Sequence, residues 1–147
     1  MIKNNFLIIS ILLFLPMLAA AENFKVEVDT GTETINALEG TLSLPPGAQI
    51  GPIYTGNSVI LIWITPPKVL ENTIKFAGIT PGGFRGRYPI FSFDGSSNAG
   101  NYSFESVNAI RSDGSGASVS VRLSVSPAEI KEDEAPPEPF APVVSSS

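Results

Sequence analysis

The side chains best suited to catalysis are scarce in this chain of 147 residues. It contains no cysteine and no histidine, which removes thiol nucleophiles, the commonest general base and the commonest transition-metal ligand. A serine triad lacks its imidazole for the same reason. Hydrolysis by two carboxylates needs an acid and a base at a fixed separation in a cleft, whereas candidates such as Glu39 and Glu105 are expected on an open sheet face. These residues predict a non-catalytic protein.

Two short turns contain the oxygen ligands that calcium uses. They lie at residues 94–98 and 113–116 and are rich in aspartate, asparagine, serine and glycine. Neither has the spaced run of carboxylates that a dedicated calcium site needs, and ordinary turn chemistry accounts for both. We therefore predict no metal site in the chain itself.

A glycine-rich segment at 82–87 reads Gly-Gly-Phe-Arg-Gly-Arg. Arg85 and Arg87 in this segment would suit a phosphate or an acidic partner. A phosphate-binding loop, however, has its glycines between a strand and the N-terminus of a helix, and no helix is predicted here. The segment is better interpreted as a flexible connection.

Four aromatic side chains offer faces that stack on sugar rings. They are Tyr54, Trp63, Tyr88 and Tyr102. Trp63 belongs to the most apolar segment of the mature chain, which favours a place in the core. Carbohydrate binding by these aromatics therefore stays an alternative to the interpretation reached below.

The elements that position these residues are short strands. Apolar and polar residues alternate with a period of two, and glycine, proline, asparagine and aspartate separate the alternating runs. No segment keeps a helical period over helical length. The sequence predicts an all-β fold, a jelly-roll-like antiparallel β-sandwich of about eight strands. We expect these strands at 24–28, 35–44, 49–54, 58–65, 73–79, 89–94, 101–107 and 118–125.

The segment 58–65 differs from the other strands because it is apolar on both faces. Such a run is typical of a central strand that is covered on both sides. One of its faces would alternatively be a binding surface, but large exposed apolar patches are uncommon on soluble proteins. We therefore expect a buried central strand that ends at Pro66 and Pro67.

The first 21 residues have the three parts of a secretory signal peptide. Lys3 supplies the positive charge, residues 6–18 form an apolar run, and three alanines end at Ala21. A retained anchor is the alternative, although the apolar run is shorter than the roughly 20 residues that a membrane span needs. We expect cleavage near Ala21 and a secreted or cell-surface protein.

Beyond the leader, the sequence divides into a domain at 22–127 and a tail at 128–147. The tail is acidic and rich in proline, as in a disordered linker. Such a linker suggests a further module or an envelope anchor beyond Ser147. The net charge of −5 at pH 7 gives no sign of the basic surface that nucleic-acid binding requires.

The order of several motifs resembles the cohesin-like domains of bacterial extracellular proteins. Residues 35–44, Ile-Asn-Ala-Leu-Glu-Gly-Thr-Leu-Ser-Leu, are similar to a family strand with the sequence VNAVEGTLSF. The resemblance extends over residues 24–125 and includes the segments 73–78, 91–93, 100–104 and 107–116. It implies a nine-stranded jelly roll that is related to carbohydrate-binding modules. The family's usual first strand is missing here, which would leave an edge open around 118–125.

The resemblance also implies a function, because well-studied cohesins dock a calcium-loaded dockerin module on one sheet face. The matching outward positions are Glu39, Thr41, Ser43, Lys75 and Glu105. Taken singly, each is also explained as a solvated position, because half-buried sheets have a polar face. We expect protein docking or adhesion through a dockerin-type partner, with no cofactor except calcium brought by that partner. The alternatives are a module that binds polysaccharide and a structural spacer.

Overall fold

The computed structural model describes residues 21–96 and 101–129. Nearly all of the leader predicted at 1–21 and most of the tail predicted at 128–147 lie outside the described residues. The strands are β1 (Glu22–Asp29), β2 (Ile35–Ser43), β3 (Ile50–Tyr54), β4 (Ile62–Leu70), β5 (Thr73–Phe84), β6 (Arg87–Gly95), β7 (Ser103–Arg111), β8 (Ser118–Val119) and β9 (Arg122–Pro127). Their pairing is antiparallel throughout, so the predicted all-β sandwich is confirmed.

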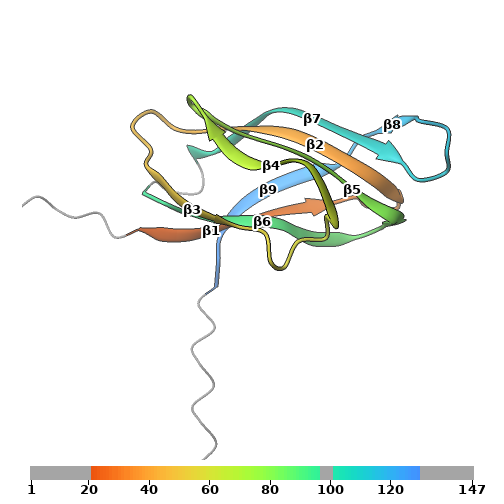
Figure 1. Cartoon of the computed structure of the whole chain (residues 1–147), viewed down its shortest axis with the longest axis horizontal. Coiled ribbons are helices and arrows are strands. Elements are labelled where there is room, and N and C mark those ends of the chain that lie inside the picture. The colour runs from red at the N-terminus through yellow and green to blue at the C-terminus, as the bar shows by residue number, and fades with distance from the viewer. Residues whose placement is uncertain (1–20, 97–100, 130–147) are drawn as a thin grey trace, which may run out of the picture.

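The strands form two facing layers (Figure 1). A four-stranded sheet has the order β3-β6-β1-β9, and a five-stranded sheet has the order β4-β5-β2-β7-β8. Most connections cross from one sheet to the other, whereas the β4–β5 and β7–β8 connections stay within one sheet. The other neighbouring strands in each sheet therefore come from separate parts of the sequence.

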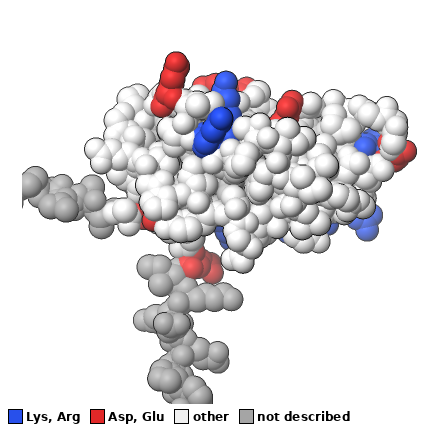
Figure 2. Space-filling view, in the orientation of Figure 1, with Lys and Arg blue, Asp and Glu red and all other residues white. Residues whose placement is uncertain are grey.

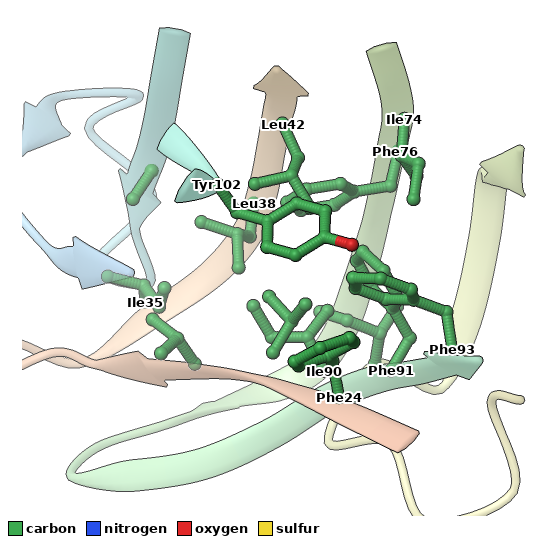
Figure 3. Close-up of a cluster of buried hydrophobic side chains, with 14 of the residues drawn as sticks. Phe24, Ile35, Leu38, Leu42, Ile74, Phe76, Ile90, Phe91, Phe93 and Tyr102 are labelled. Atoms are coloured by element: carbon green, nitrogen blue, oxygen red, sulfur yellow. The ribbon is translucent and has the colours of Figure 1, made fainter. Parts of the chain in front are cut away.

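The core lies between the two sheets and is rich in aromatic rings (Figure 3). The ring of Tyr102 lies 5.2 Å from that of Phe24 and 5.3 Å from that of Phe93, measured between centroids. Leu38 and Leu42 of β2 face these rings and are almost completely buried. The period-two alternation predicted for β1 and β2 thus places their apolar faces in one core.

The strand predicted at 58–65 is not central, and this prediction was wrong. Its residues from Ile62 onward belong to β4, which is the edge strand of the five-stranded sheet and pairs only with β5. Pro66 and Pro67 do not end the strand but lie within it, at an irregularity in the β4–β5 ladder. An edge strand accommodates proline because the donors on its free side have no ladder to complete.

The segment predicted as one final strand at 118–125 is divided between the two sheets. β8 pairs with β7 in the five-stranded sheet, and β9 pairs with β1 in the four-stranded sheet. The four aliphatic side chains of the segment nevertheless all pack against the core: Val119, Val121, Leu123 and Val125. Both β8 and β9 lie at sheet edges within the described part of the chain.

The connection predicted at 82–87 is short, and it passes from the five-stranded sheet to the four-stranded sheet. β5 continues to Phe84 and β6 begins at Arg87, so only Arg85 and Gly86 lie between the strands. Gly86 has a φ angle of 110°, a conformation that glycine adopts without the steric cost of a side chain. Gly82 and Gly83 lie near the end of β5 and also have positive φ angles, of 85° and 76°.

No helix within the ranges 21–96 and 101–129 has the length and apolarity needed to cross a membrane.

Candidate functional site

The candidate site is the outer face of the five-stranded sheet, defined here as the side of that sheet away from the core. Strand register arranges its side chains in rows across the sheet, because directly opposite residues point to the same side. Thr41 of β2 lies between Lys75 of β5 and Ser106 of β7. Glu39 of β2 occupies the next row, opposite Ala77 and Asn108.

Three of the five residues predicted for this face line one shallow hollow of about 290 Å³. They are Glu39, Thr41 and Lys75. Thr65 of β4 and Ser106 of β7 complete its polar lining. Ser43 lies at the end of β2, opposite Thr73 and Ser103, and is not part of the hollow.

Glu105, the remaining predicted residue, does not line this hollow. The β2–β7 register shifts between Thr41, which is opposite Ser106, and Leu42, which is opposite Phe104. Glu105 is therefore the extra residue of a β-bulge, and it is exposed. A bulge inserts one residue and reverses the alternation beyond it, so Ser106 contributes the outward side chain in this row.

A row of aliphatic side chains crosses the same face and was not predicted. Ile62, Ile79, Ala37 and Ile110 lie opposite one another on four adjacent strands. Ile64 lines a second hollow of about 120 Å³ beside Ala37 and Ile110. We call Ala37, Ile62, Ile64, Ala77, Ile79 and Ile110 the aliphatic patch.

The β4 part of this patch is unusually exposed for large apolar side chains. Ile64 is 70% exposed and Ile62 is 50% exposed, and the preceding Leu61 is 68% exposed. The sequence signal for these residues was the apolar run at 58–65. That signal was interpreted as burial because apolar composition does not distinguish a central strand from an edge strand.

Charged side chains on this face are few, and two of them are lysines that lie close together. Lys68 and Lys75 lie directly opposite each other in the β4–β5 ladder. Among the described residues, no salt bridge joins either lysine to a carboxylate. Like charges in this arrangement are destabilising. In Figure 2 charged side chains are spaced along the upper edge of the molecule, over the layer of the five-stranded sheet, and the surface between them is uncharged.

Glu39 is held by hydrogen bonds rather than by an ion pair. Asn108 Nδ2 donates to Glu39 Oε1 at 3.2 Å, and Ser118 Oγ donates to Asn108 Oδ1 at 3.0 Å. These bonds link β2, β7 and β8 across the outer face. The carboxylate of Glu39 is thereby positioned beside the aliphatic patch.

The four aromatic residues considered for sugar stacking do not form a common platform. Tyr102 is buried, and Trp63 lies opposite Gly78 and packs against the core. Tyr88 lies opposite the buried Val28 and stacks edge-on with Phe84. Tyr54 alone among the four projects from the outer side of the four-stranded sheet, opposite Ser92.

The arginine segment is engaged within the fold. Arg87 lies 3.4 Å from the carboxylate of Asp29. The backbone N–H of Gly31 and the side chain of Arg87 donate to that carboxylate and hold the pKa of Asp29 below its ordinary value.

Asp113 accepts hydrogen bonds from Ser115 in the turn at 113–116. The described residues contain no cluster of three acidic side chains that would hold a metal ion.

Comparisons of the chain with protein-family models, curated proteins and solved structures found no match.

Proposed function

We propose that this protein is a non-catalytic docking module that binds a protein partner on the outer face of its five-stranded sheet. The observation that carries this proposal is the aliphatic patch, in which Ile62 and Ile64 project from an edge strand into solvent. Exposed apolar clusters rimmed by polar residues mark interaction sites. Here the rim is polar, with Glu39, Thr41 and Lys75 on one side.

The chemistry of the face supports a partner with an apolar stripe and acidic side chains. An apolar stripe on the partner would cover the aliphatic patch, and an acidic side chain beside it would pair with Lys68 or Lys75. Such a carboxylate would relieve the repulsion between the two lysines, which lie directly opposite each other. An amphipathic helix with aliphatic residues flanked by carboxylates meets both requirements.

The resemblance to cohesin-like domains supports the same partner class. It suggests a dockerin-type module, and calcium would then belong to that partner rather than to this chain. The predicted leader supports an extracellular or cell-surface location. If no protein binds the face, a spacer role replaces docking.

Binding to a purified dockerin module, with calcium and with a chelator, tests the proposal. We expect the unmodified protein to bind in calcium and Ile64→Asp to lose binding, because the variant places a charge in the aliphatic patch. Ser124→Asp is the charge control: it introduces the same charge at an exposed position of β9 on the other sheet, opposite Glu27, and thermal unfolding verifies that both variants are folded. Lys75→Glu should weaken binding to an acidic partner.

Two outcomes would contradict the proposal. Equal binding by Ile64→Asp and Ser124→Asp would remove the outer face of the five-stranded sheet as the interface. Absence of binding by the unmodified protein, with and without calcium, would reject dockerin-type docking and favour the spacer role.

A further inference from the structure

The other sheet also has a hollowed outer face, and its lining is of a different kind. A groove of about 560 Å³ crosses β3, β6 and β1 on the side away from the core. Its floor includes Lys25 of β1 and Ser92 of β6, which lie opposite each other. Tyr54 and the loop at 55–58 form one wall, and Ala128 lies at the margin. Sites that hold small ligands have volumes of about 300–1,000 Å³.

Tyr54 presents an aromatic ring at this groove in a fixed orientation. The ring is 48% exposed, and its hydroxyl donates to Asp94 Oδ2 at 3.0 Å. Asp94 Oδ1 in turn accepts from Asn23 Nδ2 at 2.9 Å. The hydroxyl end of Tyr54 is therefore anchored to two strands of the same sheet.

The polar lining supplies hydrogen-bond donors and acceptors without a dominant charge. Asn23, Lys25, Asn57, Ser58 and Ser92 contribute amide, ammonium and hydroxyl groups. The ammonium of Lys25 lies 3.2 Å from the carboxylate of Glu27, and the carboxylate of Asp94 is engaged by two donors. Lys25 is thus paired with a carboxylate, and both oxygens of Asp94 accept hydrogen bonds within the fold, so the neutral groups define what the groove recognises.

We propose that this groove binds a neutral saccharide, with one sugar ring stacked on Tyr54. Sugar rings have apolar C–H faces that pack on aromatic rings and hydroxyl groups at their edges that need donors and acceptors. The groove provides one aromatic face beside a row of amides and hydroxyls, and it is long enough to cross three strands. The outward residues of β1 at this groove, Asn23 and Lys25, are polar, in contrast to the aliphatic patch on the other sheet.

This site is separate from the docking face in the fold. The groove lies on the four-stranded sheet, the aliphatic patch lies on the five-stranded sheet, and the core separates them. Binding of saccharide consequently does not depend on the docking proposal, and either can fail alone.

Titration with neutral tetrasaccharides, followed by amide shifts in NMR spectra, tests the proposal. The probes are tetramers from cellulose, xylan, mannan, galactan and chitin, each added to about 10 mM, where even weak binding with a Kd near 1 mM is detected. We expect at least one probe to shift amides around Tyr54, Lys25 and Ser92. Tyr54→Ala should weaken its binding about tenfold, the usual scale for loss of an aromatic stack together with its buried area.

Three further variants separate stacking from other effects. Tyr54→Phe keeps the ring and loses the bond to Asp94, so it should bind within a few-fold of the unmodified protein. Tyr88→Ala is the matched aromatic control, because Tyr88 is also partly exposed but faces the core side of the sheet. Ile64→Asp should bind saccharide normally.

Several results would overturn the proposal. These are the absence of shifts with all five probes, shifts confined to the five-stranded sheet, and equal affinity of Tyr54→Ala and the unmodified protein. Thermal unfolding of each variant establishes that Tyr54→Ala is folded, and Tyr54→Phe provides the comparison if it is not.

Discussion

Gly78 provides the sharpest test of how the edge strand β4 packs on its neighbour. Gly78 lies opposite Trp63 in the β4–β5 ladder. A Cβ atom added there would lie 2.3 Å from Ile60 Cγ2, 2.9 Å from the carbonyl oxygen of Ile62 and 3.2 Å from Trp63 Cε3. All three distances are shorter than the 3.4 Å at which ordinary contact begins. The nearest backbone atom belongs to β4 itself, so Gly78→Ala requires that strand to move.

Two opposing effects set the magnitude. Alanine restricts the unfolded chain and in a compatible site stabilises a protein by about 0.4–1 kcal/mol. Overpacking of a filled site costs about 1–3 kcal/mol, and here backbone as well as side-chain atoms are in the way. The steric effect should win, with a net loss of about 1–2 kcal/mol. For a domain near 100 residues, this corresponds to a decrease in Tm of roughly 5–15 °C.

Thermal and urea unfolding of Gly78→Ala measures this loss, with two other glycines as controls. At Gly56 an added Cβ meets no atom within 4 Å, so Gly56→Ala should leave stability unchanged or slightly raised. At Gly40 the nearest atom is Cζ of Phe76 at 2.6 Å, and a ring tip yields more easily than a strand. We therefore expect an intermediate loss for Gly40→Ala. If Gly78→Ala were as stable as Gly56→Ala, the described packing of β4 on β5 would be refuted, and with it the exposure of Ile62 and Ile64.

Substitutions at two positions test the turn that joins β1 and β2. Thr30 is 3% exposed, and its Oγ1 donates to the carbonyl of Glu33 at 2.7 Å and accepts from the N–H of Gly86 at 2.9 Å. Because Thr30→Val leaves both partners without this hydroxyl, it should lower the free energy of unfolding in urea by about 1–3 kcal/mol. Thr30→Ser keeps the hydroxyl and should retain most of the stability. Asp29 has a pKa held below its ordinary value of 3.8, first by the Gly31 N–H and then by Arg87. The ionised carboxylate therefore contributes to stability above the unfolded-state pKa, and this contribution is lost as pH falls through the lower folded-state pKa. Below about pH 4, the stability of Asp29→Asn should consequently decline less than that of the unmodified protein.

The outcomes that would contradict these two expectations are distinct. Equal losses in Thr30→Val and Thr30→Ser would show that shape at this position matters more than the hydroxyl. Parallel acid profiles for Asp29→Asn and the unmodified protein would show that the bonds from Gly31 and Arg87 do not favour the ionised carboxylate.

The alternating strands were predictable because one physical requirement determines them. In residues 24–28 and 35–44, one side of each strand is buried and the other is solvated, so polarity alternates with the period of the backbone. The same rule held for the aliphatic residues at 118–125, although the segment passes from one sheet to the other. The alternation of apolar and polar residues indicates which side of a strand faces the core. It does not indicate in which sheet the strand pairs.

The position of a strand within its sheet was not predictable in the same way. The apolar run at 58–65 is equally compatible with a central strand and with an edge strand that carries a binding surface. Pro66 and Pro67 were the available signal for the edge, since β4 contains both prolines and continues to Leu70, and proline within a strand is typical of sheet edges and bulges. The bulge at Glu105 gave no such signal, because a single inserted residue reverses the facing of its neighbours without a change in composition.

Each of the two proposed binding surfaces lies beside an edge strand whose irregular structure discourages pairing with a further strand. β4 ends the five-stranded sheet with two prolines and an irregular ladder, features that discourage pairing with another strand. In the proposed docking, its apolar side chains would therefore contact the partner by side-chain packing rather than by strand addition. In the four-stranded sheet the edge strand β3 is short and irregular, and the loop that follows it overhangs the sheet and walls the groove. One edge thus leaves an exposed aliphatic face, where we propose protein docking, and the other borders the deeper groove that we propose for a saccharide.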